Sequence, residues 1–322
     1  MKKNSDILVS ITCITYNHEK YIADALDSFL MQKTNFNYEI LIHDDASTDQ
    51  TAQIIREYEK KYPDIIKPIY QTENQYSKGI RVGDFNRKRV MGKYIAICEG
   101  DDYWQDPYKL EKQVEYMEAH PECSLYVHAA YRVSPNNKKM KCHVSPFSKS
   151  REVSIEEVIE GGGDLFATSS YFYPSKFKDN LPNFYEISPI GDYPLVVYLA
   201  LNGMVYYNNN FMSAYRVNVS GSWVQRISSD INKKIDHFYK MNKMFDELNK
   251  YTNCEYQDLI EKINYRREVS LLLALESFKE LDRLKSDKRY SEISAKTKFR
   301  IIFHQYLPGI AKKIEILAKR YI

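Results

Sequence analysis

The sequence lacks the glycine-rich loops that commonly cradle phosphates. Only 11 glycines occur in 322 residues, and the chain contains neither GxGxxG after its first apolar run nor GxxxxGK[ST] anywhere. Such loops bring backbone amides close to a dinucleotide or a triphosphate. Dinucleotide-binding and P-loop proteins are therefore disfavoured, and a phosphate bound by this chain would need another source of positive charge.

Long apolar runs and paired cysteines are also missing. No run reaches the roughly 18 apolar residues of a membrane span. The five cysteines are scattered without a CxxC pair, which favours reduced thiols and a cytoplasmic location. The net charge is only +3, and no stripe of basic and aromatic residues occurs, so we do not expect a nucleic-acid partner. Hydrophobic residues at 43% and charged residues at 28% are typical of a globular protein.

The first 130 residues alternate between strand and helix patterns. Apolar runs predict strands at residues 7–14, 39–42, 64–70, 94–98 and 124–128. Apolar residues at helical spacing predict helices at 22–30, 52–58 and 110–117. This alternation predicts an α/β fold with a mostly parallel sheet and helices on both faces.

The rest of the chain is organised differently. Residues 131–225 are less regular and contain one clear helix, which Pro194 is expected to open and Gly203 to end. Helical spacing dominates from about residue 228 onward. We therefore expect one domain over 1–225, with halves at 1–130 and 131–225, and a helical C-terminal extension over 226–322.

Polar residues cluster directly after three of the predicted strands. The clusters are Thr15-Tyr16-Asn17, Asp44-Asp45 and Glu99-Gly100-Asp101-Asp102. In an open parallel sheet, ligands bind in the crevice beyond the carboxyl ends of the strands. The order of the elements therefore predicts that these three segments meet at one site.

The clusters also have simpler explanations. Asp44 and Asp45 suit a turn, and Asp49 and Asp106 suit helix caps. Tyr16 could be ordinary packing, and the acidic tetrapeptide could be a solvated turn. Crowded carboxylates repel, however, and at least one pKa rises unless a cation compensates. Because Mg²⁺ and Mn²⁺ prefer oxygen ligands, we favour a divalent cation at residues 99–102.

Four segments taken together resemble the family 2 glycosyltransferases, whose fold is called GT-A. They are "VSITCITYNHEKYIADALDSFLMQ", "YEILIHDDASTDQT", "MGKYIAICEGDDYWQDPYKLEKQV" and "ISPIGDYPLVVYLALNG". The segments occur in the order and spacing of that family, and the resemblance covers about residues 6–220. It implies a GT-A domain that binds a nucleotide-sugar donor.

The resemblance implies nucleotide-binding roles in all three clusters. Tyr16 would stack on the base, with Thr15 nearby. Asp45 would accept a hydrogen bond from the base, and Asp44 is its neighbour. Asp101 would lie by the ribose or the metal.

The resemblance also implies the metal site and the catalytic base. Asp102, together with Asp101, would hold Mn²⁺ or Mg²⁺ on the diphosphate, and Glu99 occupies the first acidic position of the motif. Asp192 would be the general base. Its position near a helix start also permits a simpler role, stabilisation of the helix dipole by about 0.3–1 kcal/mol, and that dipole would lower its pKa.

The chain departs from the family pattern at two positions. Gly191 stands where many members have Glu, so the base lacks its usual partner. Asn218 stands where members often have a histidine near the metal, which leaves a third protein ligand in doubt. Arg216 and Trp223 are expected in a loop that closes over the nucleotide.

The expected activity is inverting transfer of a sugar from a nucleotide-sugar, most simply a UDP-sugar, to an acceptor hydroxyl. The acceptor would be a glycan or lipid-linked glycan in capsule, exopolysaccharide or other surface-glycan synthesis. A sugar nucleotidyltransferase and a catalytically inactive sugar-nucleotide-binding partner remain alternatives. A glycosidase is disfavoured because it needs two carboxylates flanking the scissile bond.

The C-terminal segment 297–322 is basic and amphipathic. It suits docking at the anionic inner face of the plasma membrane, where each Lys or Arg contributes about 1 kcal/mol. Packing on the protein itself, or a homodimer contact through the C-terminal helices, explains the same pattern equally well.

Overall fold

The computed structural model describes residues 7–219 and 223–306. Contacts divide the chain into two compact units. The first comprises residues 1–182 and 190–219, and the second comprises residues 183–189 and 220–322. The first unit contains the sheet and the second is helical, so each is described by itself.

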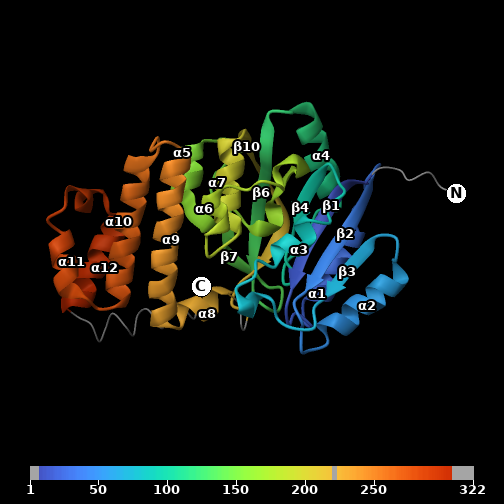
Figure 1. Ribbon diagram of the computed structural model, residues 1–322, viewed down its shortest axis with the longest axis horizontal. Coiled ribbons are helices and arrows are strands. Elements are labelled where there is room, and N and C mark those ends of the chain that lie inside the picture. Colours follow the sequence, from blue (N-terminus) through green and yellow to red (C-terminus); the bar gives the residue numbers. More distant parts are fainter. Residues whose placement is uncertain (1–6, 220–222, 307–322) are drawn as a thin grey trace. The chain divides into compact units, whose positions relative to one another are not determined.

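Four parallel strands form one half of the sheet in the first unit (Figure 1). They are β1 (Ile7–Thr15), β2 (Asn37–Asp44), β3 (Ile66–Tyr70) and β4 (Tyr94–Ile97). Their spatial order is β3-β2-β1-β4, and every neighbouring pair is parallel. Helices α1 (Ile22–Leu30) and α2 (Thr51–Lys61) connect the first three strands in the predicted alternation.

The other half of the sheet is mixed. The short strand β9 (Phe172–Pro174) pairs antiparallel with both β4 and β6 (Cys123–Val133). The long strand β10 (Met204–Arg216) runs parallel to β6. Three further strands pair antiparallel at this half: β5 (Tyr103–Trp104), β7 (Lys139–Val144) and β8 (Arg151–Val153). The strand predicted at 124–128 therefore belongs to the sheet but does not lie beside β4.

Helices pack on the sheet through completely buried apolar side chains. Leu26 and Phe29 of α1, Ile55 of α2 and Leu110 of α4 (Lys109–Ala119) are all inaccessible to solvent. Full burial of such a side chain contributes about 1.5–3 kcal/mol. The ring of Phe29 meets Trp104 edge-on at 4.8 Å between centroids, which fixes the start of the segment that follows the acidic tetrapeptide.

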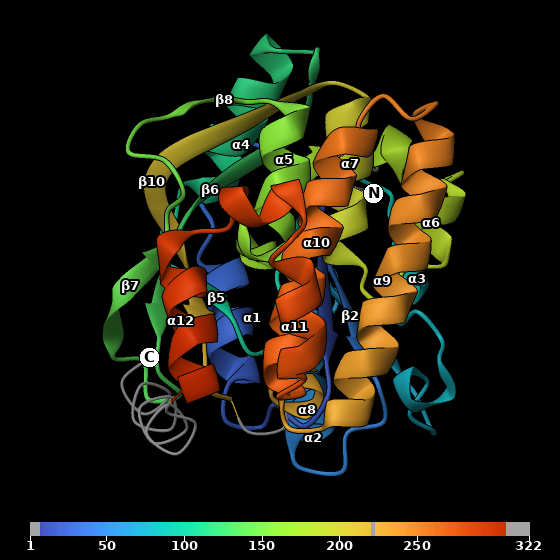
Figure 2. The same ribbon diagram turned by 90° about the vertical axis from the view of Figure 1, so that its left-hand side faces the viewer.

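The second unit consists of helices. They are α6 (Asn183–Glu186), α8 (Trp223–Ser228), α9 (Ile231–Tyr251), α10 (Gln257–Ala274), α11 (Phe278–Leu284) and α12 (Ala295–Tyr306). Figure 2 shows α10, α11 and α12 side by side, and their buried faces share one apolar cluster that includes Val269, Leu281 and Ile301. The predicted helical C-terminal region is confirmed. None of the helices in the described ranges has the length and apolarity needed to cross a membrane.

Candidate functional site

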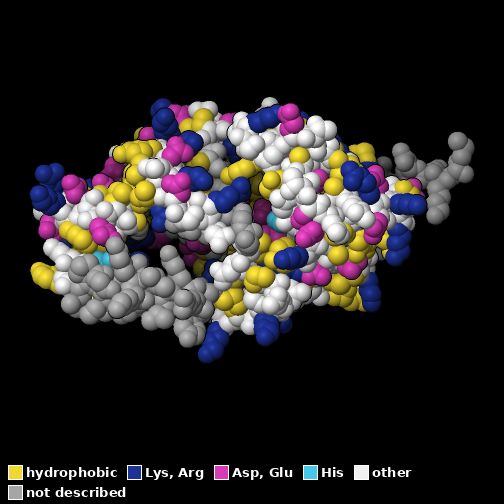
Figure 3. Space-filling view, turned by 90° about the horizontal axis from the view of Figure 1, so that it is seen from below, with side chains coloured by type: hydrophobic (Ala, Val, Ile, Leu, Met, Phe, Trp, Pro, Cys, Tyr) yellow, Lys and Arg dark blue, Asp and Glu magenta, His cyan; other side chains and the backbone are white. Residues whose placement is uncertain are grey.

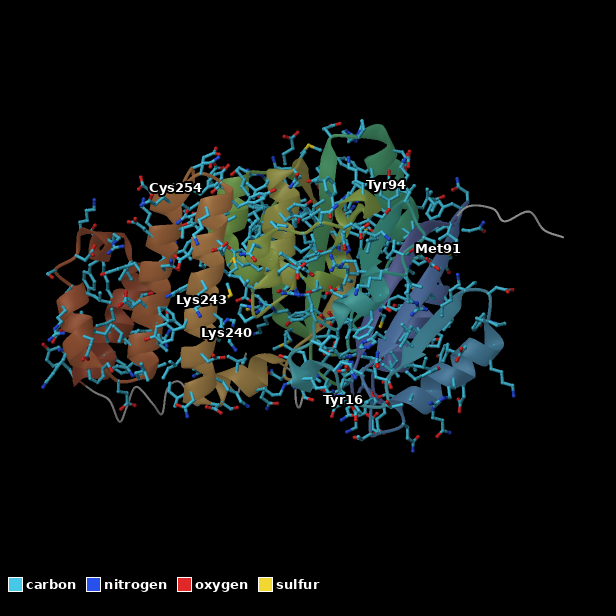
Figure 4. All side chains as sticks on the ribbon, in the orientation of Figure 1. Tyr16, Met91, Tyr94, Lys240, Lys243 and Cys254 are labelled. Carbon is cyan, nitrogen blue, oxygen red and sulfur yellow. The ribbon has the colours of Figure 1, made fainter. Side chains whose placement is uncertain are left out.

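The three polar clusters meet at the carboxyl ends of β1, β2 and β4. Thr15 lies opposite Asp44 in the β1–β2 register. The amide of Asp45 donates to the carbonyl of Thr15 at 3.0 Å, and the amide of Gly100 donates to the carbonyl of Ile14 at 2.9 Å. In Figure 4, Tyr16 lies at the opposite end of the sheet from Tyr94, the first residue of β4. The structure therefore brings the three predicted segments together.

The loops that follow β1 and β2 are tied to each other. Asn17, which has a φ of 56°, accepts a hydrogen bond from the amide of Thr48 at 2.8 Å. Its own amide donates to Ser47 Oγ at 2.9 Å. Asn is one of the few residues that adopts positive φ readily. These bonds hold the neighbouring Tyr16 in place while its side chain stays 38% exposed, with ring surface available for stacking.

Asp44 and Asp45 both have protein partners. Asp44 accepts from Ser47 Oγ at 2.5 Å, and burial raises the pKa of its carboxyl group. Asp45 accepts from the amides of Gln75 and Tyr76 at 2.8 and 3.0 Å. The turn that the sequence suggested is therefore present. A carboxylate has about four lone-pair positions, so a further bond from a nucleotide base to Asp45 stays a prediction.

Gly100 is a site residue that the sequence reasoning missed. A Cβ atom at this position would lie 2.7 Å from Thr15 Oγ1 and 2.8 Å from Thr15 Cβ. Thr15 Oγ1 is buried and has no hydrogen-bond partner among the described residues. Only glycine lets the acidic loop approach β1 this closely, and its place between Glu99 and Asp101 was the available signal.

The acidic loop concentrates negative charge at the end of β4. Asp102 is 2% exposed, and its Oδ1 accepts from the amide of Arg216 at 2.8 Å. Burial and the charge of Asp101 raise the pKa of Asp102 well above its usual value. Glu99 is exposed to solvent, yet the density of protein around it and the charges of Asp101 and Asp192 raise its pKa as well. The loop is therefore short of positive charge.

The oxygen donors of this loop fit a hard divalent cation. Asp101 and Asp102 are adjacent, and Asp101 Oδ2 lies 3.9 Å from Nε2 of His18. Within residues 7–219 and 223–306, no three His, Cys, Asp or Glu side chains are grouped as a metal site. Mg²⁺ is commonly held by one or two carboxylates together with substrate phosphates. The carboxylate oxygens and their excess negative charge suit a cation whose remaining ligands come from a bound diphosphate.

Asp192 is the first residue of α7 (Asp192–Leu201), and its charge acts on Glu99 of the acidic loop. We expected Pro194 to open the helix, but the helix begins two residues earlier, because proline is tolerated in the first turn. Oδ1 of Asp192 accepts from the amide of Tyr193 at 2.8 Å. Burial raises the pKa of Asp192, and the charge of Asp164 adds to the rise. The lowering expected from the helix dipole is therefore outweighed.

Arg216 does not lie in a loop, and that prediction is wrong. It is the last residue of β10, and its side chain is completely buried. The guanidinium donates to the carboxylate of Asp24, to the carbonyl of Asp101 and to Asn137 Oδ1 at 2.8 Å. Its carbon also lies 4.8 Å from the ring centroids of Tyr21 and Tyr103. Arg216 thus ties the acidic loop to α1 and to the turn after β6.

The other two residues that were expected near Arg216 are less informative. Asn218 is exposed and has a φ of 61°. The side chain of Trp223 lies outside the described residues. Any contact of these residues with a nucleotide stays a prediction.

The molecular surface carries charges of both signs. In the view of Figure 3, Lys and Arg side chains are interspersed with Asp and Glu side chains. The acidic loop, residues 99–102, by contrast gathers three carboxylates at the end of β4.

Comparison with protein families gives a specific match. Residues 10–171, half of the 322-residue chain, match the model of "Glycosyl transferase family 2". An uncharacterised protein of Mycobacterium tuberculosis is 38% identical over 220 residues, which are 67% of this chain and 60% of that protein. The chain thus spans about 60% of the length of that curated relative. A putative teichuronic acid biosynthesis glycosyltransferase of Bacillus subtilis is 38% identical over 110 residues, 34% of this chain and 42% of the relative.

Solved structures show the same fold. TarS residues 1–349 of S. aureus in complex with UDP-GlcNAc align with a TM-score of 0.53 and 18% identity, over 83% of this chain and 81% of that one. The mannosyltransferase PcManGT of Pyrobaculum calidifontis, in complex with GDP-Man and Mn²⁺, aligns with a TM-score of 0.53 and 15% identity, over 98% and 91%. The predicted family resemblance and fold class are confirmed.

Proposed function

Because the chain belongs to glycosyl transferase family 2, we propose that it transfers a sugar from a UDP-sugar to a hydroxyl of a surface glycan, with inversion at the anomeric carbon. One observation carries the proposal. A carboxylate-rich loop with excess negative charge lies where the carboxyl ends of three parallel strands meet, and a second, half-buried acid, Asp192, acts on it electrostatically. This arrangement separates a leaving-group side from an acceptor side.

The donor side comprises the ends of β1, β2 and β4. The exposed ring of Tyr16 stacks on the base, beside Thr15, while Asp45, with Asp44 behind it, accepts from the base edge. Asp102 and Asp101 would hold Mn²⁺ or Mg²⁺ with the diphosphate, and Glu99 is a third acid at this site. Such a cation would supply positive charge to the departing diphosphate. The UDP-GlcNAc complex of TarS and the Mn²⁺ complex of PcManGT support this choice of donor and metal.

The acceptor side centres on Asp192. Its carboxylate takes the proton of the acceptor hydroxyl as that oxygen bonds to the anomeric carbon. The bond between the anomeric carbon and the diphosphate oxygen breaks on the opposite face, which inverts the configuration. A carboxylate with a raised pKa is a stronger base than an ordinary aspartate, and burial provides that rise at Asp192. The missing Glu at Gly191 then matters less, because burial itself raises the basicity.

Family membership weakens the two alternatives. A sugar nucleotidyltransferase would need a basic glycine-rich loop after β1, where this chain has "CITYNHEK". A catalytically inactive binder would not need a half-buried acid with a raised pKa at the start of α7. The teichuronic acid relative supports a surface-polysaccharide acceptor.

The proposal is tested by separating donor binding from transfer. We would compare wild type with Asp102→Ala, Asp192→Asn and the exposed control Asp64→Asn, measuring thermal stabilisation by UDP-GlcNAc with and without Mn²⁺. A ligand that binds only the native state raises the unfolding midpoint. We expect Asp102→Ala to lose the Mn²⁺-dependent stabilisation. Asp192→Asn should keep it but lose transfer by roughly 10²–10⁴-fold, the usual contribution of a general base.

Two results would overturn these assignments. Near-full turnover by Asp192→Asn would remove it as the base. A stabilisation by UDP-GlcNAc that chelation of Mn²⁺ leaves unchanged would remove the metal, and so would Asp102→Ala behaving like Asp64→Asn.

We also propose that the second unit docks at the inner face of the plasma membrane. Helix α12 exposes Phe299, Ile302 and Tyr306 at helical spacing, by 64%, 50% and 73%. Residues 307–322, the rest of the basic segment, lie outside the described residues. Deleting residues 297–322 should move the protein from the membrane fraction to the supernatant, and unchanged fractionation would contradict docking in favour of packing or a dimer contact.

A further inference from the structure

A cavity of about 240 Å³ lies in the first unit. Its lining includes Arg132 of β6, Val144 of β7, Ser145 and Asp164. Val144 also packs against Ala130 in a small apolar cluster. The lining therefore combines apolar side chains with a few polar groups, as small-molecule subsites usually do.

Arg132 is the unusual member of this lining. Its Nε atom is buried and has no hydrogen-bond partner, and no ion pair of Arg132 occurs among the described residues. A guanidinium stays charged at any physiological pH. Burying a charged donor without a partner costs free energy, and a carboxylate or phosphate that accepts two of its N–H groups recovers that cost. The half-buried guanidinium of Arg132 can therefore donate to an oxyanion that enters the cavity.

Asp164, which also lines the cavity, is the link to Asp192. Asp164 ends the short 3₁₀ turn Gly162–Asp164, and its charge contributes to the raised pKa of Asp192. In the same turn, a Cβ on Gly163 would lie in ordinary contact, at 3.8 Å, with Cβ of Tyr193. The turn therefore packs on the first turn of α7, which carries Asp192. A ligand in the cavity would therefore meet a positive charge at Arg132 and a negative charge at Asp164, the residue whose charge acts on Asp192.

We propose that this cavity is an acceptor subsite that recognises an oxyanion, a carboxylate or a phosphate, carried by the acceptor glycan. The assignment of the cavity to the acceptor rests on the proposed function. The anion bonds to Arg132, which directs the reactive hydroxyl toward Asp164 and Asp192. The acidic wall repels the anion from the base, so the two ends of the acceptor residue are not interchangeable. The enzyme then selects charged over neutral acceptors.

The test measures binding of three small probes to the full-length protein. The probes are methyl β-D-glucopyranoside, its 6-carboxylate and its 6-phosphate. The proteins are wild type, Arg132→Gln, Arg132→Lys and the control Arg56→Gln, which changes an exposed arginine on α2. Each protein is first saturated with UDP and Mn²⁺, so that the probes do not occupy the diphosphate position. Affinities are then measured by ligand-observed NMR.

We expect wild type to bind at least one anionic probe about tenfold more tightly than the neutral probe, as a charge-assisted hydrogen-bond pair implies. Arg132→Gln should abolish this preference, Arg132→Lys should keep part of it, and Arg56→Gln should behave as wild type. A tighter carboxylate indicates a uronic acid in the acceptor, and a tighter phosphate indicates a phosphorylated glycan. UDP affinity should be the same in all four proteins.

Three results would overturn the inference: no preference in wild type, a preference that survives in Arg132→Gln, or a loss of UDP affinity in Arg132→Gln, which would make Arg132 a donor ligand. Failure of the proposed function looks different, because wild type then does not bind UDP with Mn²⁺ at all. In that case the same titrations are run on the unliganded protein, and the anion preference is still expected.

Discussion

Arg216 holds the acidic loop in place, and its removal should affect both stability and donor binding. The variant Arg216→Met keeps the length of the side chain and removes all its donors. Asp24 is 43% exposed, so water can replace its lost bond. The carbonyl of Asp101 and the side-chain oxygen of Asn137 lose their buried donor. The loop that carries Asp101 and Asp102 then has one tie fewer to α1 and β6.

The size of the effect follows from these two groups. The carbonyl of Asp101 belongs to a half-buried residue, and leaving it without its donor costs about 1–3 kcal/mol. Asn137 is exposed, so water can replace its lost bond. We therefore expect the free energy of unfolding to fall by about 1–3 kcal/mol. For a domain of this size, each kcal/mol shifts the unfolding midpoint by about 2–4 °C, so we expect a drop of roughly 2–12 °C. Arg151→Met is the matched control, because Arg151 pairs with Glu157 at the surface with 46% exposure, and it should cost about 1 kcal/mol or less.

Thermal unfolding and a titration with UDP in the presence of Mn²⁺ check this prediction together. Arg216→Met should unfold at a lower temperature and bind UDP about tenfold or more weakly. A displaced acidic loop that loses about 1.4 kcal/mol of binding free energy lowers the affinity tenfold. Arg151→Met should change neither measurement appreciably. If Arg216→Met kept the wild-type midpoint and lost UDP affinity, the arginine would be a direct donor ligand and the reasoning would be refuted.

Two further predictions concern neighbouring residues. Gly100→Ala places a Cβ 2.7 Å from Thr15 Oγ1, and overpacking of this kind costs about 1–3 kcal/mol. The variant should therefore have a lower unfolding midpoint and a lower affinity for UDP than wild type. Wild-type values in both measurements would contradict the close approach. Lys109 is completely buried beside Trp104, and burial lowers the pKa of its ammonium group to about 7. The unfolded lysine titrates near 10.4, so between about pH 7 and 10 the unfolded chain binds more protons and this contribution to stability rises with pH. Urea unfolding of Lys109→Met at pH 7 and pH 9 should lack that rise, and parallel profiles of the variant and wild type would contradict it.

The parallel half of the fold was predictable because its signals are local. The runs at 7–14 and 39–42 are apolar and uninterrupted, and each ends in a polar cluster. The strand β9 could not be predicted in this way, because three residues carry no periodicity and Phe172 is held there by its neighbours β4 and β6. The environment of Arg216 was equally hidden, since its partner Asp24 is 192 residues away in the chain. Such a contact depends on how β10 returns to the sheet, which no window of the sequence records.

The candidate site shows why the density of acids in a sequence is an incomplete guide to function. Asp49 accepts from Thr51 and from the amide of Glu19, and these bonds lower its pKa against the effect of burial. Asp45 is similarly satisfied by two backbone amides. Asp102 receives one amide bond, and its pKa still rises because of burial and neighbouring carboxylates. A carboxylate whose hydrogen-bond donors come from the protein holds a loop together. A carboxylate with uncompensated negative charge is a candidate ligand for a cation. By that criterion, residues 99–102 are where we propose a cation, whereas Asp49 bonds to the first residue of α2, whose N-cap is Gln50.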